Sequence, residues 1–196
     1  MNFLAHLYLS GDSENIMVGN FIGDYVKGKN YEKYTEEIKY GILLHRKIDA
    51  FTDSNSIVRL SKNHFIEKYH KYAGVITDII YDHFLTSLWD NYSKTPLRNF
   101  IYYSYEVLLN NYNLLPIRVK QFLPHFVIYN WLESYSSIEG LARVFKRMSI
   151  RTSLPEETDY AIKELKTNYL KLKKEFDHFF PLLIEHVKED KIVKIA

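Results

Sequence analysis

Three polar residues, His45, Asp49 and Asp53, recur every four positions in a stretch that is otherwise largely apolar. In an α-helix, residues four apart share one face with Cβ atoms about 5–6 Å apart, so these side chains would form a single polar stripe. A neutral imidazole beside carboxylates on a rigid helix suits a divalent cation, and an oxygen-rich set favours Mn²⁺, Fe²⁺ or Mg²⁺ over a closed zinc site. An ordinary pair on a helix surface is the alternative that the spacing leaves open.

Three further places carry ionisable residues among apolar neighbours. Asp24 lies in the segment NFIGDYVKG, where a carboxylate either faces solvent or is held by a cation. Asp82 and His83 are adjacent in IIYDHFL, and helix neighbours differ in direction by about 100°. Only one of the two can therefore point at a metal, and the other would act as a general acid or would orient a ligand. His6, in FLAHLYL, fits a buried hydrogen-bonded histidine as well as it fits a metal ligand.

Other kinds of catalytic site are excluded by what the sequence lacks. Without cysteine there can be no disulfide, zinc–thiolate site, iron–sulfur cluster or cysteine nucleophile. The sequence also has no Gly-x-Ser-x-Gly nucleophile motif and no glycine-rich phosphate loop. Nucleophilic catalysis and nucleotide binding by a phosphate loop are therefore poor alternatives for this chain.

The elements that must position these residues are predicted to be helices. The chain has 196 residues, 46% of them hydrophobic, with only 7 glycines and 5 prolines, which leaves little material for a turn-rich β architecture. Helical spacing is predicted over residues 14–28, 36–53, 57–73, 75–92, 97–112, 117–133, 140–148 and 155–186. Pro124 is expected to kink or split its helix, and Pro181 to kink the last one. We therefore predict an all-α protein with a single domain, residues 1–196, of about seven or eight helices.

Membrane association and export are not expected. No stretch approaches the ~18 uninterrupted apolar residues of a membrane-spanning helix. The opening MNFLAHLYLSGD is short, contains His6 and has no basic residue before its apolar part, unlike a signal peptide. The expected compartment is the cytoplasm.

The charge is unevenly distributed along the chain. Residues 91–151 carry 8 Lys and Arg against 3 Asp and Glu, whereas residues 1–90 carry 10 against 12. Arg143, Lys146 and Arg147 would share one helix face, with Arg151 just beyond. A positive surface of this kind suits an anionic partner, although scattered basic residues that merely solvate the helices explain the excess equally well.

Several motifs in the first half of the chain occur together. They are MNFLAHL at the start, GDYVKG at 23–28, GILLHRKID at 41–49 with FTD at 51–53, and YDHFL at 81–85. In this combination and order the sequence resembles the acyl carrier protein phosphodiesterases, an offshoot of the HD phosphohydrolases. The resemblance implies a distorted HD-phosphohydrolase-like helical bundle. It also implies hydrolysis of 4′-phosphopantetheine from the serine of holo-acyl carrier protein, with manganese as cofactor.

The resemblance also implies roles for particular residues. The metal would be held by Asp24, His45, Asp49 and Asp82, where it would polarise the phosphodiester and lower the pKa of a water molecule. His83 or His6 would protonate the leaving serine oxygen, and Asp53 would be a ligand, a base or an orienting residue. The basic residues Arg46 and Lys47 would offset phosphate charge, and Arg143, Arg147 and Arg151 would contact the carrier protein. The sequence departs from the wider HD superfamily because it contains no His directly followed by Asp.

Two other functional classes remain compatible with the residues. One is another metal-dependent phosphohydrolase, acting on a nucleotide or a small phosphodiester. The other is a non-enzymatic helical binding module, for which the basic middle segment would bind nucleic acid. A binding module gives no reason to place Asp24, His45, Asp49 and Asp82 on apolar helices, so we expect holo-acyl carrier protein as the partner and neither nucleic acid nor a membrane.

Overall fold

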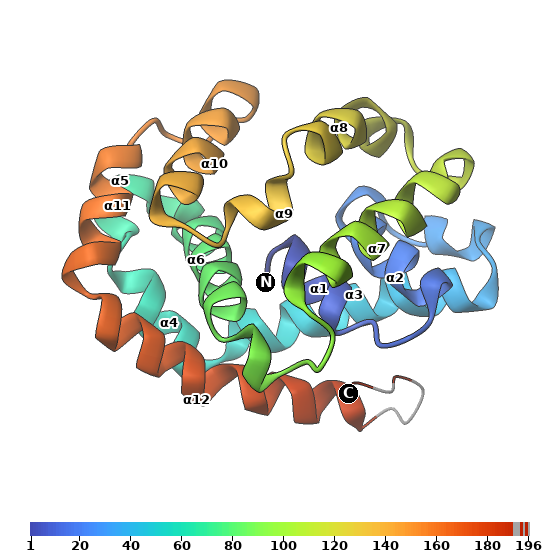
Figure 1. Cartoon of the computed structure of the whole chain (residues 1–196), viewed down its shortest axis with the longest axis horizontal. Helices are drawn as coiled ribbons and strands as arrows, with labels where there is room; N and C mark the ends of the chain where they lie inside the picture. The colour runs from blue at the N-terminus through green and yellow to red at the C-terminus, as the bar shows by residue number, and fades with distance from the viewer. Residues whose placement is uncertain (190–192, 194, 196) are drawn as a thin grey trace.

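Helices account for all the regular secondary structure that this protein shows. The computed structural model describes residues 1–189, Val193 and Ile195, and this part of the chain contains no strand (Figure 1). The longer helices are α2 (Glu14–Ile22), α3 (Glu36–Ser54), α4 (Ser56–Asn63), α6 (Ala73–Ser87), α7 (Leu97–Asn110), α8 (Ile117–Ile128), α10 (Ile138–Arg151), α11 (Thr158–Thr167) and α12 (Tyr169–Lys188). Short helical segments are α1 (Phe3–Tyr8), α5 (Ile66–Tyr69) and α9 (Trp131–Ser134), with 3₁₀ turns η1 (Gly23–Tyr25), η2 (Asn30–Lys33), η3 (His70–Tyr72), η4 (Trp89–Asn91) and η5 (Tyr112–Leu114). The all-α prediction is confirmed.

The predicted number of helices was too low because several periodic runs break into two or more. The run over 117–133 divides at Asn130, whose φ of 44° lies in the left-handed region, rather than at Pro124, which lies inside α8. The final run divides at Asn168 into α11 and α12, and α12 continues through Pro181. The run over 57–73 divides first between α4, which ends at Asn63, and α5, which begins at Ile66, and again at His70, whose φ is 47°. Hydrophobic periodicity persists across such breaks because both halves face the same core.

Side-chain caps explain where some helices begin. Ser13 Oγ accepts a hydrogen bond from the Ile16 amide at 3.3 Å, and Ser137 Oγ accepts one from the Gly140 amide at 3.0 Å. These bonds satisfy amides that the first turn of a helix leaves unpaired. Thr35 occupies the predicted N-cap position of α3 with an extended backbone, although its side chain makes no capping bond.

Helices α2 and α3 approach each other unusually closely. A Cβ atom on Gly19 would lie 2.1 Å from the Ile38 carbonyl oxygen, and one on Gly41 would lie 2.3 Å from the Ile16 carbonyl oxygen. Only glycine at both positions permits this backbone contact. The consequence for function is that Asn20, the residue after Gly19, lies against His45, one turn beyond Gly41.

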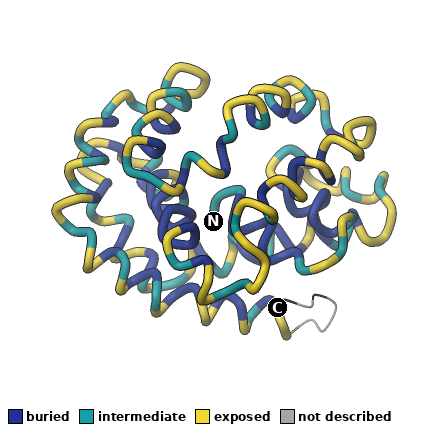
Figure 2. Tube along the Cα trace, viewed as in Figure 1, coloured by how far each residue is buried: buried dark blue, intermediate teal, exposed yellow. Residues whose placement is uncertain are grey.

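The hydrophobic core runs through the middle of the molecule, and α6 is largely buried in it. Eleven of the 15 residues of α6 are buried, including Asp82 and His83. Figure 2 shows the buried segments gathered in the interior of the molecule. Aromatic side chains of α12, among them Phe176 and Phe179, pack against Tyr81 of α6 with ring centroids 5.4 and 5.6 Å apart. Among the described residues no helix is long and apolar enough to cross a bilayer.

Candidate metal centre and active site

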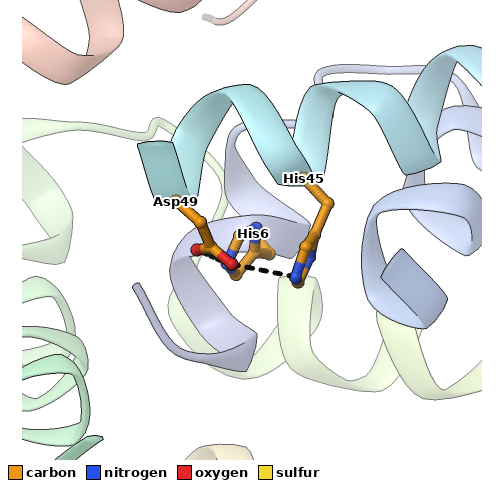
Figure 3. Close-up of side chains that lie close together, drawn as sticks. All are labelled: His6, His45 and Asp49. Atoms are coloured by element: carbon orange, nitrogen blue, oxygen red, sulfur yellow. Dashed lines mark ion pairs between the residues drawn. The ribbon is translucent and has the colours of Figure 1, made fainter. Parts of the chain in front are cut away.

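His6 from α1 and His45 and Asp49 from α3 converge on one point (Figure 3). One possible ligand atom from each residue lies within 4.8 Å of the others. His6 Nε2 is 3.2 Å from Asp49 Oδ1, and His45 Nε2 is 3.2 Å from Asp49 Oδ2. The spacing of four between His45 and Asp49 therefore places both on the face of α3 that meets α1. We call these three residues the triad.

Asn20 fixes the orientation of both imidazoles. Its side-chain Nδ2 donates to the His6 carbonyl oxygen and to Ser10 Oγ, at 2.7 and 3.0 Å, so its Oδ1 is the acceptor that faces His6 Nδ1 at 2.8 Å. The backbone carbonyl oxygen of the same residue lies 2.7 Å from His45 Nδ1. Both Nδ1 atoms are therefore donors, which assigns the remaining nitrogen, Nε2, as the free position of each neutral ring.

The free positions of the two rings face oxygen atoms. His6 Nε2 lies between Asp49 Oδ1 and the Met1 carbonyl oxygen, both at 3.2 Å. His45 Nε2 is buried, and no hydrogen bond within the described residues reaches it. A lone pair that faces oxygen lone pairs is unfavourable unless a proton or a metal ion lies between them. The donor set and its geometry thus fit a cation bound by two imidazoles and a carboxylate.

The pKa values of the triad reflect this crowding. Burial and the neighbouring His45 lower the pKa of His6 to about 4. Burial opposes a charge on His45 as well, but the contacts with Asp24 and Asp49 outweigh it and raise the pKa of His45 to about 9. Burial likewise opposes ionisation of Asp49, yet its contacts with His45 and His6 hold its pKa well below the usual range. Without a metal ion, the proton shared by His45 and Asp49 therefore resides on His45.

Asp24 extends the triad toward solvent. It lies in η1, and its Oδ1 is 3.5 Å from His45 Nε2, a contact that lowers the pKa of Asp24. Its side chain is 70% exposed, so the carboxylate lies at the mouth of the site rather than in its floor. A pocket of about 290 Å³ opens here, lined by Gly23, Asp24, Val26, Lys27, Gly28, His45, Arg46 and Asp49. We call this the phosphate pocket.

Gly23 determines how closely η1 approaches the His45 ring. A Cβ atom at this position would lie 2.3 Å from His45 Cγ and 2.6 Å from Cδ2. No side chain can be accommodated at that distance without moving the imidazole. The glycine therefore lets the turn that carries Asp24 pack directly on the ring.

Asp49 has a second set of neighbours. The Met1 amino nitrogen lies 3.4 Å from Asp49 Oδ1 and 3.4 Å from Asp78 Oδ1. Burial raises the pKa of Asp78, and its Oδ1 has no hydrogen bond within the described residues. Asp78 therefore belongs to the surroundings of the site, on the side that faces α6.

The structure does not bring Asp82 and His83 to the triad. Asp82 is fully buried, and its two carboxylate oxygens accept hydrogen bonds from the amides of Leu4 and Ala5, at 2.8 and 3.1 Å. Asp82 thus binds the N-terminus of α1, the helix that carries His6. His83 Nδ1 lies 2.7 Å from the Tyr135 carbonyl oxygen and its Nε2 is 3.3 Å from the Tyr169 hydroxyl, so both nitrogens are directed elsewhere.

Asp53 and Arg46 also have partners that the sequence did not indicate. Asp53 is 74% exposed and pairs with Lys62 at 2.7 Å, which directs it away from the triad. Arg46 Nη2 donates to the carbonyl oxygens of Val26 and Gly28, at 2.7 and 2.8 Å, and so holds the wall of the phosphate pocket. Lys47 is half-buried on α3.

The basic residues of α10 are not among the described residues that line the phosphate pocket. Arg143, Lys146 and Arg151 are exposed, whereas Arg147 is half-buried with its guanidinium carbon 4.4 Å from the centroid of the Tyr129 ring. The predicted positive helix face is therefore present, and Tyr129 restrains one of its members.

Sequence reasoning missed Asn20, Gly23 and Asp78 as parts of this site. Asn20 is a polar residue inside the apolar run IMVGNFI, which was a signal available in the sequence. The signal is weak because Asn20 acts through its backbone carbonyl and its side-chain amide, and neither group has a characteristic spacing in sequence from the histidines that it contacts. His6, His45 and Asp49 were all among the predicted residues.

The chain is similar to proteins of one known family. A family model described as acyl carrier protein phosphodiesterase matches residues 1–183. An acyl carrier protein phosphodiesterase of Yersinia enterocolitica is 28% identical over 193 residues, which are 98% of this chain and 100% of the relative. Another, of Klebsiella pneumoniae, is 30% identical over 185 residues, covering 94% of this chain and 96% of the relative.

No solved structure matches the chain, so the likeness to HD phosphohydrolases remains a prediction. The family model, by contrast, covers nearly the whole sequence and includes every residue of the triad and the phosphate pocket. The chain belongs to the acyl carrier protein phosphodiesterase family.

Proposed function

We propose that this protein hydrolyses the phosphodiester that joins 4′-phosphopantetheine to the serine of holo-acyl carrier protein, which releases the apo form. Membership of the family supports the reaction. The convergence of His6 Nε2, His45 Nε2 and the Asp49 carboxylate supports a divalent cation at the reacting phosphate, and it is the single observation on which the proposal depends most.

The donor set favours Mn²⁺ as the cofactor, with Fe²⁺ next. Two imidazoles and one carboxylate suit these ions, whereas Mg²⁺ prefers an all-oxygen shell. Three protein ligands also leave coordination positions for water and for a phosphoryl oxygen. Asn20 supports the cation indirectly because it holds both rings in the tautomer that presents Nε2.

When bound, the cation would polarise the phosphodiester and lower the pKa of a water molecule. The chain supplies the rest. Asp24, whose lowered pKa keeps it ionised, is placed at the mouth of the pocket to accept the proton of the attacking water. Lys27 and Arg46 line the same pocket and offset the phosphate charge. We assign to Lys27 the donation of a proton to the departing serine oxygen. His83 is directed toward Tyr135 and Tyr169 and is not assigned this role.

The basic face of α10 is proposed to contact the carrier protein. Carrier proteins of this kind are typically acidic, and Arg143, Lys146 and Arg151 are exposed. Such contacts accelerate and orient encounter more than they strengthen binding.

The decisive experiment is incubation of holo-acyl carrier protein with the protein and Mn²⁺, followed by mass measurement of the carrier. We expect loss of the phosphopantetheine mass, abolished in Asp49→Ala and strongly slowed in Asp24→Ala. Asp53→Ala is the matched control. It removes a carboxylate from the same helix, but one that is exposed and pairs with Lys62 of α4 rather than with the triad. A fully active Asp49→Ala variant would show that the triad is not the site. If the protein hydrolyses a nucleotide or a small phosphodiester but not holo-acyl carrier protein, the carrier protein is not its substrate.

A further inference from the structure

A second pocket lies beside the phosphate pocket and is mainly aromatic. It has a volume of about 230 Å³, and its lining includes Phe3, Tyr25, Phe122, Trp131, Met148 and Arg151. The Phe122 ring contacts those of Phe3 and Tyr25, with centroids 6.0 and 5.5 Å apart. These residues come from α1, η1, α8, α9 and α10, so the pocket lies where the two halves of the chain meet. We call it the aromatic pocket.

Trp131, one of the residues that line this pocket, carries an unsatisfied donor. The residue is only 9% exposed, and its indole Nε1 is buried without a hydrogen-bond partner in the described part of the chain. Trp89 shows the ordinary situation, because its Nε1 donates to the Thr95 carbonyl oxygen at 2.7 Å. A buried N–H group is almost always paired in a folded protein. The donor of Trp131 therefore lacks the acceptor that such a group normally has, and the described residues do not supply one.

The aromatic pocket is joined to the candidate active site by short pieces of backbone. Tyr25 directly follows Asp24, which lies at the mouth of the phosphate pocket. Phe3 lies one turn before His6 on α1. The two pockets are thus lined by consecutive residues of η1, Asp24 in one and Tyr25 in the other.

We propose that the aromatic pocket binds the pantetheine arm of the substrate and that Trp131 Nε1 donates a hydrogen bond to one of its amide carbonyl oxygens. The inference rests on the proposed function. Pantetheine offers a dimethyl-substituted carbon and methylene groups to the aromatic walls, and two amide carbonyls as acceptors. Arg151, exposed at the rim, adds a donor for the hydroxyl or the second carbonyl. The arm is thereby recognised separately from the phosphate and from the carrier protein.

Trp131→Phe tests this assignment because it keeps an aromatic ring and removes only the donor and the outer ring atoms. We expect the KM for holo-acyl carrier protein to rise about 3- to 10-fold, as for loss of one hydrogen bond, with kcat little changed. Trp89→Phe is the matched control, since it removes a donor that is already paired within the chain. Hydrolysis of bis(4-nitrophenyl) phosphate, a phosphodiester without the arm, should be equal in wild type and Trp131→Phe.

Pantetheine itself separates this inference from the proposed function. It lacks the phosphate and the carrier protein, so it should compete with holo-acyl carrier protein on the Mn²⁺-loaded wild type and compete more weakly on Trp131→Phe. Met148→Trp, which fills the pocket from α10, should raise the KM as well and covers the case in which Trp131→Phe fails to fold.

The outcomes are distinct. Suppose that wild type releases phosphopantetheine, that Met148→Trp and Trp131→Phe have the same KM as wild type, and that pantetheine does not compete. The aromatic pocket is then not the site of the arm, and the proposed function stands. If wild type does not release phosphopantetheine at all, the proposed function fails first, and with it the identity of the arm as ligand.

Discussion

The rings of His6 and His45 stack on each other with centroids 4.0 Å apart and planes 18° apart. Two imidazolium ions cannot be held in this arrangement, because their charges would repel across a buried contact. Besides the proton on each Nδ1, the stacked pair therefore carries at most one more in the metal-free protein, and the raised pKa of His45 assigns it to Nε2 of that ring. A cation that replaces this proton would satisfy both Nε2 atoms at once.

Cation binding should release a proton at neutral pH. Because the pKa of His45 is about 9 in the metal-free protein, Nε2 is protonated below that pH and must lose its proton to become a ligand. We expect the apparent affinity for Mn²⁺ to rise about tenfold per pH unit as the pH approaches about 9 from neutral, and then to level off. Calorimetry in buffers of different ionisation enthalpy measures the released proton directly.

The metal-free protein provides the control for that experiment. A raised pKa means that the pairing of His45 with its carboxylates stabilises the fold fully below about pH 6.5 and is lost as the pH rises through about 9. His45→Gln should remove this dependence of the free energy of unfolding. An affinity for Mn²⁺ that does not change with pH would contradict the assignment of the proton.

Asn20→Ala should weaken the cation site without removing a ligand. The variant frees the His6 ring, while the Asn20 backbone carbonyl still holds His45. We expect the affinity for Mn²⁺ to fall about 10- to 100-fold. The free energy of unfolding should fall by about 1–3 kcal/mol, because buried polar groups lose their partners. Asn15→Ala on the same helix, where the side chain bonds Glu37, should change neither quantity appreciably.

Gly23→Ala should displace the His45 ring. The added Cβ would lie 2.3 Å from His45 Cγ, so the turn carrying Asp24 and the imidazole cannot both keep their places. We expect kcat/KM to fall by about 100-fold, as for small misplacements of catalytic groups. In Gly74→Ala the new Cβ meets only the end of the Lys62 side chain, at 3.3 Å, and activity should persist. Full activity of Gly23→Ala would mean that the ring position is unimportant.

Asp82→Asn distinguishes a ligand from a helix cap. Both Asp82 oxygens accept amides at the start of α1, and Asn supplies only one acceptor oxygen. We expect the free energy of unfolding to fall by about 1–2 kcal/mol while Mn²⁺ binding stays at the wild-type level. Asp49→Asn should show the opposite pattern, with Mn²⁺ binding lost and the free energy of unfolding less affected. Calorimetric titration and denaturant unfolding of both variants decide between the roles, and weak Mn²⁺ binding by Asp82→Asn would restore Asp82 as a ligand.

Charge reversal on α10 should slow encounter with an acidic carrier protein. Arg143→Glu should lower kcat/KM for holo-acyl carrier protein by about 10-fold at low salt, and the difference from wild type should shrink at high salt. Lys171→Glu changes the charge equally on α12, which runs along the opposite edge of Figure 1, and should have little effect. Equal rates for Arg143→Glu and wild type would place the carrier elsewhere.

Sequence periodicity predicted those parts of the structure that depend on neighbours along the chain. The polar stripe of α3 correctly brought His45 and Asp49 together, because a helix fixes residues four apart. The same pattern wrongly placed Asp53 with them. Each step of four residues turns the side chain about 40° further around the helix, so Asp53 faces Lys62 instead. The helix count was low for a similar reason, since Asn130 and Asn168 interrupt runs whose pattern continues beyond them.

Contacts between distant segments could not be predicted in this way. Asp82 reads as a ligand because it is acidic and lies in an apolar helix, yet its partners are the amides of Leu4 and Ala5, far away in sequence. Asn20 acts partly through its backbone carbonyl, which every residue possesses. Only the assembled helices show which of these groups meet.

The close crossing at Gly19 and Gly41 sets the distance between Asn20 and His45 by contact of main chain with main chain. Such a contact has no rotamers to adjust, so the imidazole is already poised before any ion arrives. Loading the site would then be a local event rather than a step in acquiring the fold, unlike small domains that collapse when their metal is stripped away. A cation that leaves the triad would therefore leave the helices around it assembled.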